Sequence, residues 1–244
     1  MGPDLRTTSL LIDDRILIDA GSGVGDLSLA EMSAIKQIYL THSHLDHICG
    51  LAFMADNLFD LVEDPIVVHA LPATIAALRA HIFNWVIWPD FTELPDKQNP
   101  IMSFKPVEPL VAETAPGSLQ VTPFPVHHTV PAVGYSVLGD SGVFAFSGDT
   151  AASDTLWTHL NALPRLDKLM IEIAFPDEQA ELGAASKHFT PSSLGEQLQK
   201  LQHRPLLLLT HHKPGSEALI ESQCVRALAG WDYHHLHRGD LIEI

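Results

Sequence analysis

The sequence predicts an α/β fold in which two mixed sheets pack face to face between outer helices, a four-layer αββα sandwich. Short apolar runs bounded by turn residues, which are typical of strands, alternate along the chain with helical patterns. This order occurs twice, before and after a proline-rich stretch at residues 89–116. Because each sheet must bury an apolar face against another layer, the two halves favour stacked sheets with helices outside.

Composition favours one soluble domain over residues 1–244. Hydrophobic residues make up 46% of the chain, enough for a large core, and no Gly/Ser-rich or charge-dense linker divides it. The formal net charge of −16 would repel polyanions, which argues against nucleic acid as a partner. Cys49 and Cys224 provide no disulfide framework. No signal segment or bilayer-spanning run is evident, so we expect a cytoplasmic protein without a membrane partner.

The first half of the chain alternates strand and helix patterns in order. We expect strands at residues 7–12, 16–19, 37–40, 65–69 and 101–104, and helices at 28–33, 46–61 and 72–83. Ser28 precedes the first helix and Glu31 follows three residues later, which is the pattern of a capping box. The Gly-rich loop at 20–25 lacks the spacing of a dinucleotide-binding fingerprint.

The second half repeats the alternation. Strands are expected at residues 119–125, 134–138, 143–146, 169–173 and 206–209, where apolar residues alternate or run together between turn residues. Helices are expected at 156–163, 178–185, 191–201 and 217–229. A histidine or an aspartate follows several of these strands closely, so polar side chains are expected near the strand ends.

The densest group of potential ligands lies between the strand at 37–40 and the helix that follows it. Within Thr-His-Ser-His-Leu-Asp-His, the side chains of His42 and His44 project to one side of the extended tip, and Asp46 and His47 face a second point nearby. Imidazole nitrogens with a carboxylate suit zinc, with iron or manganese as alternatives. Asp19, at an earlier strand end, is either a support for such a site or a plain turn residue.

This H-x-H-x-D-H pattern resembles the metallo-β-lactamase superfamily, which implies a two-metal site completed by three later residues. His128 precedes Gly-Tyr at the family spacing, Asp149 ends Phe-Ser-Gly-Asp, and His211 follows strand and threonine. The resemblance favours these residues over the neighbouring His127 and His212. It implies that His42, His44 and His128 hold one metal, that Asp46, His47 and His211 hold the other, and that Asp149 bridges. Zinc is the expected metal.

Two later segments resemble the phosphodiesterase members of that superfamily. Glu172 lies in Glu-Ile-Ala-Phe-Pro, and His188 lies in Ser-Lys-His-Phe-Thr-Pro. Together with the other motifs they look like bacterial class II 3',5'-cyclic-nucleotide phosphodiesterases, which implies hydrolysis of cyclic nucleotides to 5'-monophosphates. The resemblance implies catalytic roles for His188, Glu172 and Asp46. Lys213 is either a contact to phosphate or a solvated surface lysine.

The aromatic stretch at residues 81–91 has three interpretations: a substrate pocket, a subunit contact of a homodimer, or ordinary core packing. In the first, Trp85 and Trp88 would stack on the base of a nucleotide. Relatives usually begin with a strand and a Gly-rich turn, whereas only residues 1–6 precede the matching segment here. Either a first strand is missing or the start of the sequence is trimmed, which concerns the edge of the first sheet more than the chemistry.

Other functions compete with cyclic-nucleotide hydrolysis. A tRNA 3'-end endonuclease of the same superfamily shares Glu172 and His188, but it needs a basic arm that this acidic chain does not show. Another hydrolase of the same fold is a further alternative. A non-catalytic metal-binding protein is the third, although a structural zinc site needs fewer ligands.

Overall fold

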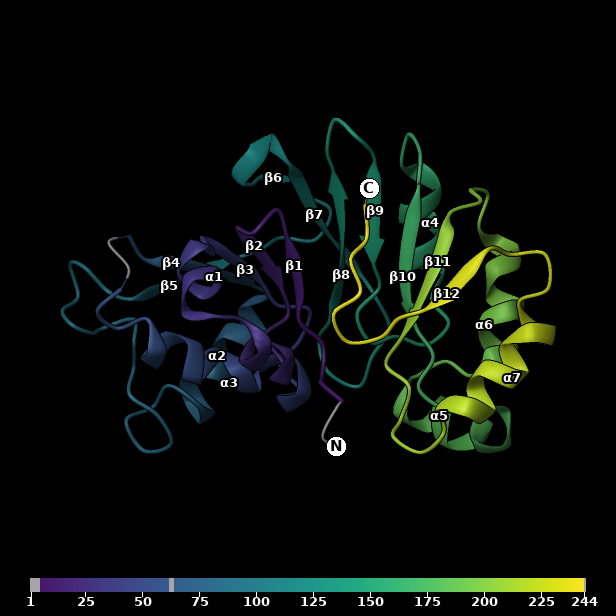
Figure 1. Cartoon of the computed structure of the whole chain (residues 1–244), viewed down its shortest axis with the longest axis horizontal. Helices are drawn as coiled ribbons and strands as arrows, with labels where there is room; N and C mark the ends of the chain where they lie inside the picture. The colour runs from purple at the N-terminus through teal and green to yellow at the C-terminus, as the bar shows by residue number, and fades with distance from the viewer. Residues whose placement is uncertain (1–4, 62–63, 244) are drawn as a thin grey trace. The chain divides into compact units, whose positions relative to one another are not determined.

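The computed structural model describes residues 5–61 and 64–243 (Figure 1). These residues form two compact units. The N-terminal unit comprises residues 6–108 and 115–118, and the C-terminal unit comprises Leu5, residues 109–114 and the chain from 119 onward. None of the helices within the described ranges is long and apolar enough to cross a lipid bilayer.

The N-terminal unit contains a five-stranded mixed sheet in the order β1-β2-β3-β4-β5. The strands are β1 (Leu10–Ile12), β2 (Ile16–Ile18), β3 (Gln37–Tyr39), β4 (Ile66–Ala70) and β5 (Met102–Pro106). A tight turn joins β1 and β2 as an antiparallel hairpin, and the remaining neighbours are parallel. The carboxyl ends of the parallel strands therefore meet at one edge, which is where ligand sites form in such sheets.

Helices cover this sheet through one apolar cluster. They are η1 (Ser22–Asp26), α1 (Leu29–Ala34), α2 (Leu45–Asn57) and α3 (Pro72–His81), and a short turn of helix, η2, spans Pro116–Ser118. Ile38 and Val68 from the sheet are buried with Met54 of α2 and Leu78 of α3. The expected capping box is confirmed, because Ser28 and Glu31 bond each other's backbone at the start of α1.

The C-terminal unit contains a seven-stranded sheet in the order β12-β11-β10-β9-β8-β7-β6. The strands are β6 (Glu113–Thr114), β7 (Gln120–Pro125), β8 (Val133–Leu138), β9 (Val143–Phe146), β10 (Lys168–Glu172), β11 (Leu206–Thr210) and β12 (Tyr233–His235). From β6 to β9 the neighbours are antiparallel, and from β9 to β12 they are parallel. Both sheets are mixed, as the sequence predicts.

The helices of this unit pack on its sheet, and the first of them contacts the antiparallel strand β7. They are α4 (Asp154–Ala162), η3 (Asp177–Gln179), α5 (Ala180–Ser186), α6 (Pro191–Gln197), η4 (Leu198–Lys200) and α7 (Glu217–Ala227). Ile171 and Leu209 of the sheet are buried with Trp157, Leu194 and Cys224 of the helices. In Figure 1, α6 and α7 lie side by side beyond β12.

The observed elements depart from the sequence prediction at several places. The strand expected at 7–12 begins at Leu10, and the helix expected to run to residue 61 ends at Asn57. Strands β6 and β12 were not predicted at all. Each has only two or three residues, which is too short for a period-two pattern to stand out from loop sequence.

Candidate active site

The first group of candidate ligands lies in the N-terminal unit, at the junction of β3 and α2. Potential ligand atoms of His42 and His44 lie within 4.8 Å of each other, and their rings meet edge to face with centroids 4.6 Å apart. Asp46 occupies the first turn of α2, where the helix dipole favours negative charge. Its Oδ2 lies 3.8 Å from Nε2 of His47.

Buried Asp19 orients this group from behind. Its carboxylate accepts from Nδ1 of His47 at 2.6 Å, and it also accepts from the backbone N of Thr41 at 2.8 Å and from the Thr41 hydroxyl at 2.8 Å. That hydroxyl in turn accepts from Nδ1 of His42 at 2.9 Å. With Nδ1 protonated on both rings, the lone pair resides on Nε2, which is the arrangement that metal-binding histidines have in proteins. Asp19 therefore orients His47 and is not a plain turn residue, and its support of a metal site stays a prediction.

Gly50 allows α2 to approach the loop that carries Asp19. The backbone N of Ala20 donates to the His47 carbonyl at 2.8 Å, and the Gly50 N donates to the Ala20 carbonyl at 2.8 Å. A Cβ on Gly50 would lie 2.5 Å from the Gly21 carbonyl oxygen, closer than atoms can pack. The Gly-rich loop thus serves helix packing, and this close approach brings Asp19 to His47.

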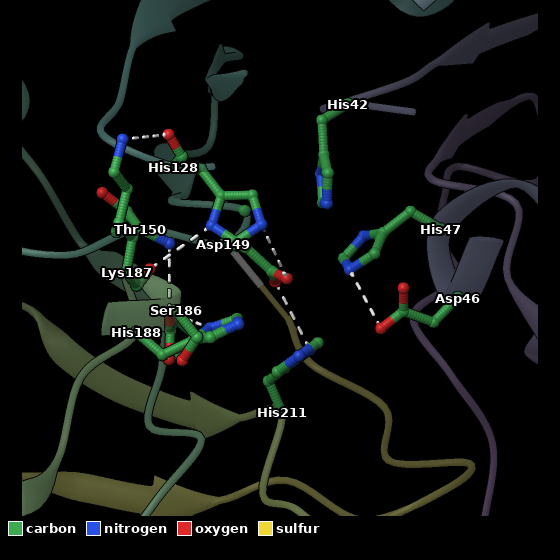
Figure 2. Close-up of polar contacts among 12 residues, drawn as sticks. His42, Asp46, His47, His128, Asp149, Thr150, Ser186, Lys187, His188 and His211 are labelled. Atoms are coloured by element: carbon green, nitrogen blue, oxygen red, sulfur yellow. Dashed lines mark hydrogen bonds and ion pairs between the residues drawn. The ribbon is translucent and has the colours of Figure 1, made fainter. Parts of the chain in front are cut away.

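The second group of candidate ligands lies in the C-terminal unit and comprises His128, Asp149 and His211. Asp149 is the third residue after β9 and comes next to Gly148. Gly148 adopts a positive φ of 59°, and the chain turns there. Its two carboxylate oxygens face different histidines: Oδ2 lies 3.8 Å from Nε2 of His128, and Oδ1 lies 3.4 Å from Nδ1 of His211 (Figure 2). His128 donates from Nδ1 to the Lys187 carbonyl at 3.3 Å, which again leaves the lone pair on Nε2.

His188 lies against this second group without belonging to it. Its ring stacks on His211 with centroids 5.3 Å apart and meets the edge of His128 at 5.0 Å. Nδ1 of His188 donates to Oε1 of Glu172 at 2.7 Å. The same fully buried carboxylate accepts from the backbone N of Thr150 at 3.0 Å and from the Phe189 N at 3.3 Å. Glu172 therefore holds the His188 ring in one orientation.

The environments of this pair shift both pKa values. Burial raises the pKa of the Glu172 carboxyl, and the hydrogen bond from His188 only partly opposes it. Burial acts to lower the pKa of His188, but the hydrogen bond and negative charge of Glu172 outweigh burial, and the pKa is raised.

Lys213 and a cavity complete the surroundings of His188 and His211. Nζ of Lys213 donates to Nε2 of His211 at 3.3 Å and lies 5.9 Å above the Phe175 ring, so it is not a freely solvated lysine. A cavity of about 210 Å³ borders His188. Its lining includes alanine methyl groups and the polar side chains of Thr190, Ser193 and Glu196.

The alternative histidines lie apart from these groups within their unit. His127 is exposed, and its backbone N donates to the Thr150 hydroxyl while its carbonyl accepts from the Ala151 N. The His212 ring contacts His235, with centroids 5.2 Å apart, and not Asp149. The preference for His128 and His211 over these two stays a prediction.

The aromatic stretch divides between core and surface. Phe83 and Phe91 are buried in the core of the N-terminal unit, whereas Trp85 is 59% exposed with a positive φ of 64°. Trp88 is half-buried: its indole N donates to the Ala52 carbonyl at 3.1 Å, and its ring meets Phe53 edge to face at 5.4 Å. Core packing thus accounts for the two phenylalanines, and the roles of the tryptophans stay predictions.

Some supporting residues were not predicted from the sequence. The Thr41 hydroxyl lies between Asp19 and His42 and bonds both side chains. Lys187 contacts His128 twice: its carbonyl accepts from Nδ1 of His128, and its Nζ donates to the His128 carbonyl at 2.8 Å. Lys187 adopts a positive φ of 58° at the end of α5. A lysine in this left-handed conformation has no sequence signature, because glycine or asparagine is the usual residue there.

Two proteins of similar sequence are named as cyclic-nucleotide phosphodiesterases. The chain is 25% identical over 219 residues to a probable 3',5'-cyclic-nucleotide phosphodiesterase of Yersinia pestis, covering 80% of this chain and 61% of that protein. It is 28% identical over 228 residues to the 3',5'-cyclic-nucleotide phosphodiesterase of Aliivibrio fischeri, covering 77% and 66%. The chain thus spans less than two thirds of the length of these relatives.

Solved structures and a family profile identify the fold and the family. The crystal structure of unliganded yeast PDE1 matches with a TM-score of 0.79 at 18% identity, covering 98% of this chain and 95% of that chain. A metallo-β-lactamase fold protein of Bacillus subtilis, YhfI, also matches with a TM-score of 0.79. The fold class predicted from the sequence is therefore confirmed. Residues 14–212 match the profile of the beta-lactamase superfamily domain, and the chain belongs to that family.

Proposed function

We propose that this protein is a metal-dependent phosphodiesterase that hydrolyses 3',5'-cyclic nucleotides to 5'-monophosphates. The observation that carries the proposal is the pair of His188 and Glu172, because a histidine held 2.7 Å from a buried carboxylate is equipped to give up a proton in a fixed direction. The pair lies beside candidate metal ligands and is not itself one of them. Relatives named as cyclic-nucleotide phosphodiesterases support the same substrate class.

The proposal includes two divalent cations, and zinc is the expected metal. It also treats residues 1–244 as a single hydrolase domain, to which both units contribute ligands. His42, His44 and His128 would bind one cation, Asp46, His47 and His211 the other, and Asp149 both. The donor set supports this assignment, because each unit groups imidazoles with a carboxylate and fixes the tautomers of His42, His47 and His128 by hydrogen bonds at Nδ1. When bound, such cations lower the pKa of water and polarise phosphoryl oxygens.

The protein's own side chains would direct the proton and the phosphate. His188 would donate the proton on Nε2 to the departing 3' oxygen of the ribose, while Glu172 keeps Nδ1 protonated and the ring in place. Asp46, in the first turn of α2, would bind one of the cations and so take part in catalysis beside the reacting phosphate. Lys213, held beside His211, would add a positive charge for a phosphoryl oxygen.

Two features offer a position for the nucleoside. Trp85 and Trp88 present indole rings that could stack on a base with little preference among bases. The cavity beside His188 instead offers alanine methyl groups with polar partners, including Glu196. Trp85→Ala and Glu196→Ala separate these positions, because only the variant at the true contact raises the KM for a cyclic nucleotide. Sedimentation of the Trp85 variant also tests whether this exposed surface forms a homodimer contact.

The proposal is tested by comparing turnover of 3',5'-cyclic AMP, 3',5'-cyclic GMP, a simple aryl phosphodiester and precursor tRNA. We expect a cyclic nucleotide to have the highest kcat/KM. Preferred cleavage of precursor tRNA would favour the endonuclease, although the net charge of −16 weighs against it. Absence of turnover on all four substrates by metal-loaded, folded protein would favour a non-catalytic metal-binding protein.

A further inference from the structure

A second type of ligand cluster lies in the C-terminal unit and shares no residue with the proposed hydrolytic site, although His212 follows His211 in the chain. His212 follows β11, Glu221 lies on α7, and His235 is the last residue of β12. The potential ligand atoms of the three side chains all lie within 4.8 Å of one another. The parallel register that pairs His235 with Leu209 brings the ends of β11 and β12 together, so residues distant in sequence meet.

The histidines of this cluster carry buried nitrogens that the protein does not satisfy. Among the described residues, Nε2 of His212 and Nδ1 of His235 are both shielded from solvent and have no hydrogen-bond partner. Buried polar atoms are nearly always paired in native proteins, and an exception calls for an unseen partner such as a water or an ion. The two rings lie 5.2 Å apart at 62°, with a carboxylate nearby, so one ion can meet all three groups.

The chemistry of the cluster selects the type of ion. Two imidazoles and one carboxylate form a donor set that binds zinc with a fourth position left for water, and the same set also suits ferrous iron. Calcium and magnesium prefer oxygen ligands throughout. We propose that His212, Glu221 and His235 bind one divalent transition-metal ion, zinc by preference, at a site separate from the hydrolytic centre. The ion links α7 to the ends of β11 and β12.

A neighbouring cluster of similar composition provides a matched control. His234, His237 and Asp240 also lie close together, but all three are exposed. Here Asp240 already accepts from Nε2 of His234 at 2.8 Å and from the backbone N of His237 at 2.9 Å. A surface turn with satisfied hydrogen bonds explains that cluster fully, and no ion is needed.

Zinc stoichiometry and affinity of the full chain test the proposal. Chelator-treated protein is titrated with Zn²⁺ against a chromophoric competitor, and bound metal is counted by mass spectrometry. We expect Glu221→Gln and His235→Ala each to bind one equivalent less than the wild type. Loss of a residue that only supports a ligand lowers metal affinity about 10–100-fold, so loss of a direct ligand should lower the zinc affinity of this site by more than about 100-fold. His234→Ala should bind as much zinc as the wild type.

A background that removes Asp149 weakens the proposed hydrolytic site, so that the contribution of the second site can be measured. In Asp149→Ala, we expect Zn²⁺ to raise the thermal midpoint, and the rise should become smaller when Glu221→Gln is added, because an ion that binds only the folded state stabilises it. Both readouts measure metal binding and not turnover, so they stand whether or not cyclic nucleotides are hydrolysed. Equal stoichiometry in the wild type, Glu221→Gln and His235→Ala would overturn the proposal, as would an equal loss in His234→Ala.

Discussion

Replacing His188 by alanine tests the chemistry that the proposed function assigns to this side chain. The imidazole lies outside the candidate ligand set, so the variant should keep its metals while losing the proton donor. General acid catalysis contributes about 10²–10⁴-fold, which corresponds to roughly 3–5 kcal/mol of transition-state stabilisation. We therefore expect kcat/KM for 3',5'-cyclic AMP to fall by that factor.

The structure also limits the damage that this substitution does to stability. Glu172 loses the hydrogen bond from His188 but keeps two donors, the backbone N of Thr150 at 3.0 Å and that of Phe189 at 3.3 Å. Loss of one of three hydrogen bonds to a buried carboxylate costs about 1–3 kcal/mol. That is smaller than the stability of a typical domain, so the variant should remain folded at assay temperature.

The assay measures kcat/KM on two substrates that differ in leaving group. An aryl phosphodiester such as bis(p-nitrophenyl) phosphate releases a phenolate that needs little protonation, so its loss in His188→Ala should be much smaller than that for cyclic AMP. Glu172→Gln should show the same pattern more weakly, because it removes the charge that orients the ring. His127→Ala is the matched control, since this exposed neighbouring histidine makes no side-chain contact with the candidate site.

Equal losses on both substrates would contradict a role as proton donor and would indicate phosphate binding or positioning instead. Unchanged rates on both would make His188 a structural residue. In that case the structure would no longer favour a phosphodiesterase over other hydrolases of this family.

Three further substitutions test individual contacts. Asp19→Asn should weaken metal binding about 10–100-fold by calorimetry, because the amide no longer orients His47; unchanged affinity would refute the support role. Asp177→Asn should destabilise the protein by less than about 1 kcal/mol. Burial acts to raise the pKa of Asp177, but the hydrogen bonds from Ser192 outweigh burial, and the pKa is lowered. The denaturation midpoints of the wild type and Asp177→Asn should therefore converge as the pH falls below about 4. A difference in midpoint that persists at that pH would contradict this reasoning. Gly50→Ala should cost about 1–3 kcal/mol, because its Cβ would lie 2.5 Å from a carbonyl oxygen; wild-type stability would show that the loop yields freely.

Local patterns in the sequence predict most of the elements and the strand ends that carry candidate ligands. His42, Asp149 and His211 each lie within three residues of the end of an apolar strand, so a short window contains both the strand and the side chain that follows it. The capping box of Ser28 and Glu31 is equally local and was predicted for the same reason.

Contacts between distant segments could not be predicted in this way. Asp19 could be assigned either as a support or as a turn residue from the sequence, because its bond to His47 depends on the close packing that Gly50 allows. The meeting of His212 with His235 depends on β12, whose three residues lack an apolar pattern. Tertiary hydrogen bonds and short edge strands carry little sequence signal of their own.

Metal-restored hydrolysis of 3',5'-cyclic AMP, followed by ³¹P NMR, tests the proposed function most directly. Chelator-treated protein should leave the cyclic nucleotide intact, and adding Zn²⁺ or Mn²⁺ should restore conversion to the 5'-monophosphate. Asp149→Ala should remain inactive at any metal concentration at which the wild type is active. Folded, metal-loaded protein that converts neither cyclic AMP nor cyclic GMP, or that releases the 3'-monophosphate, would contradict the proposed function.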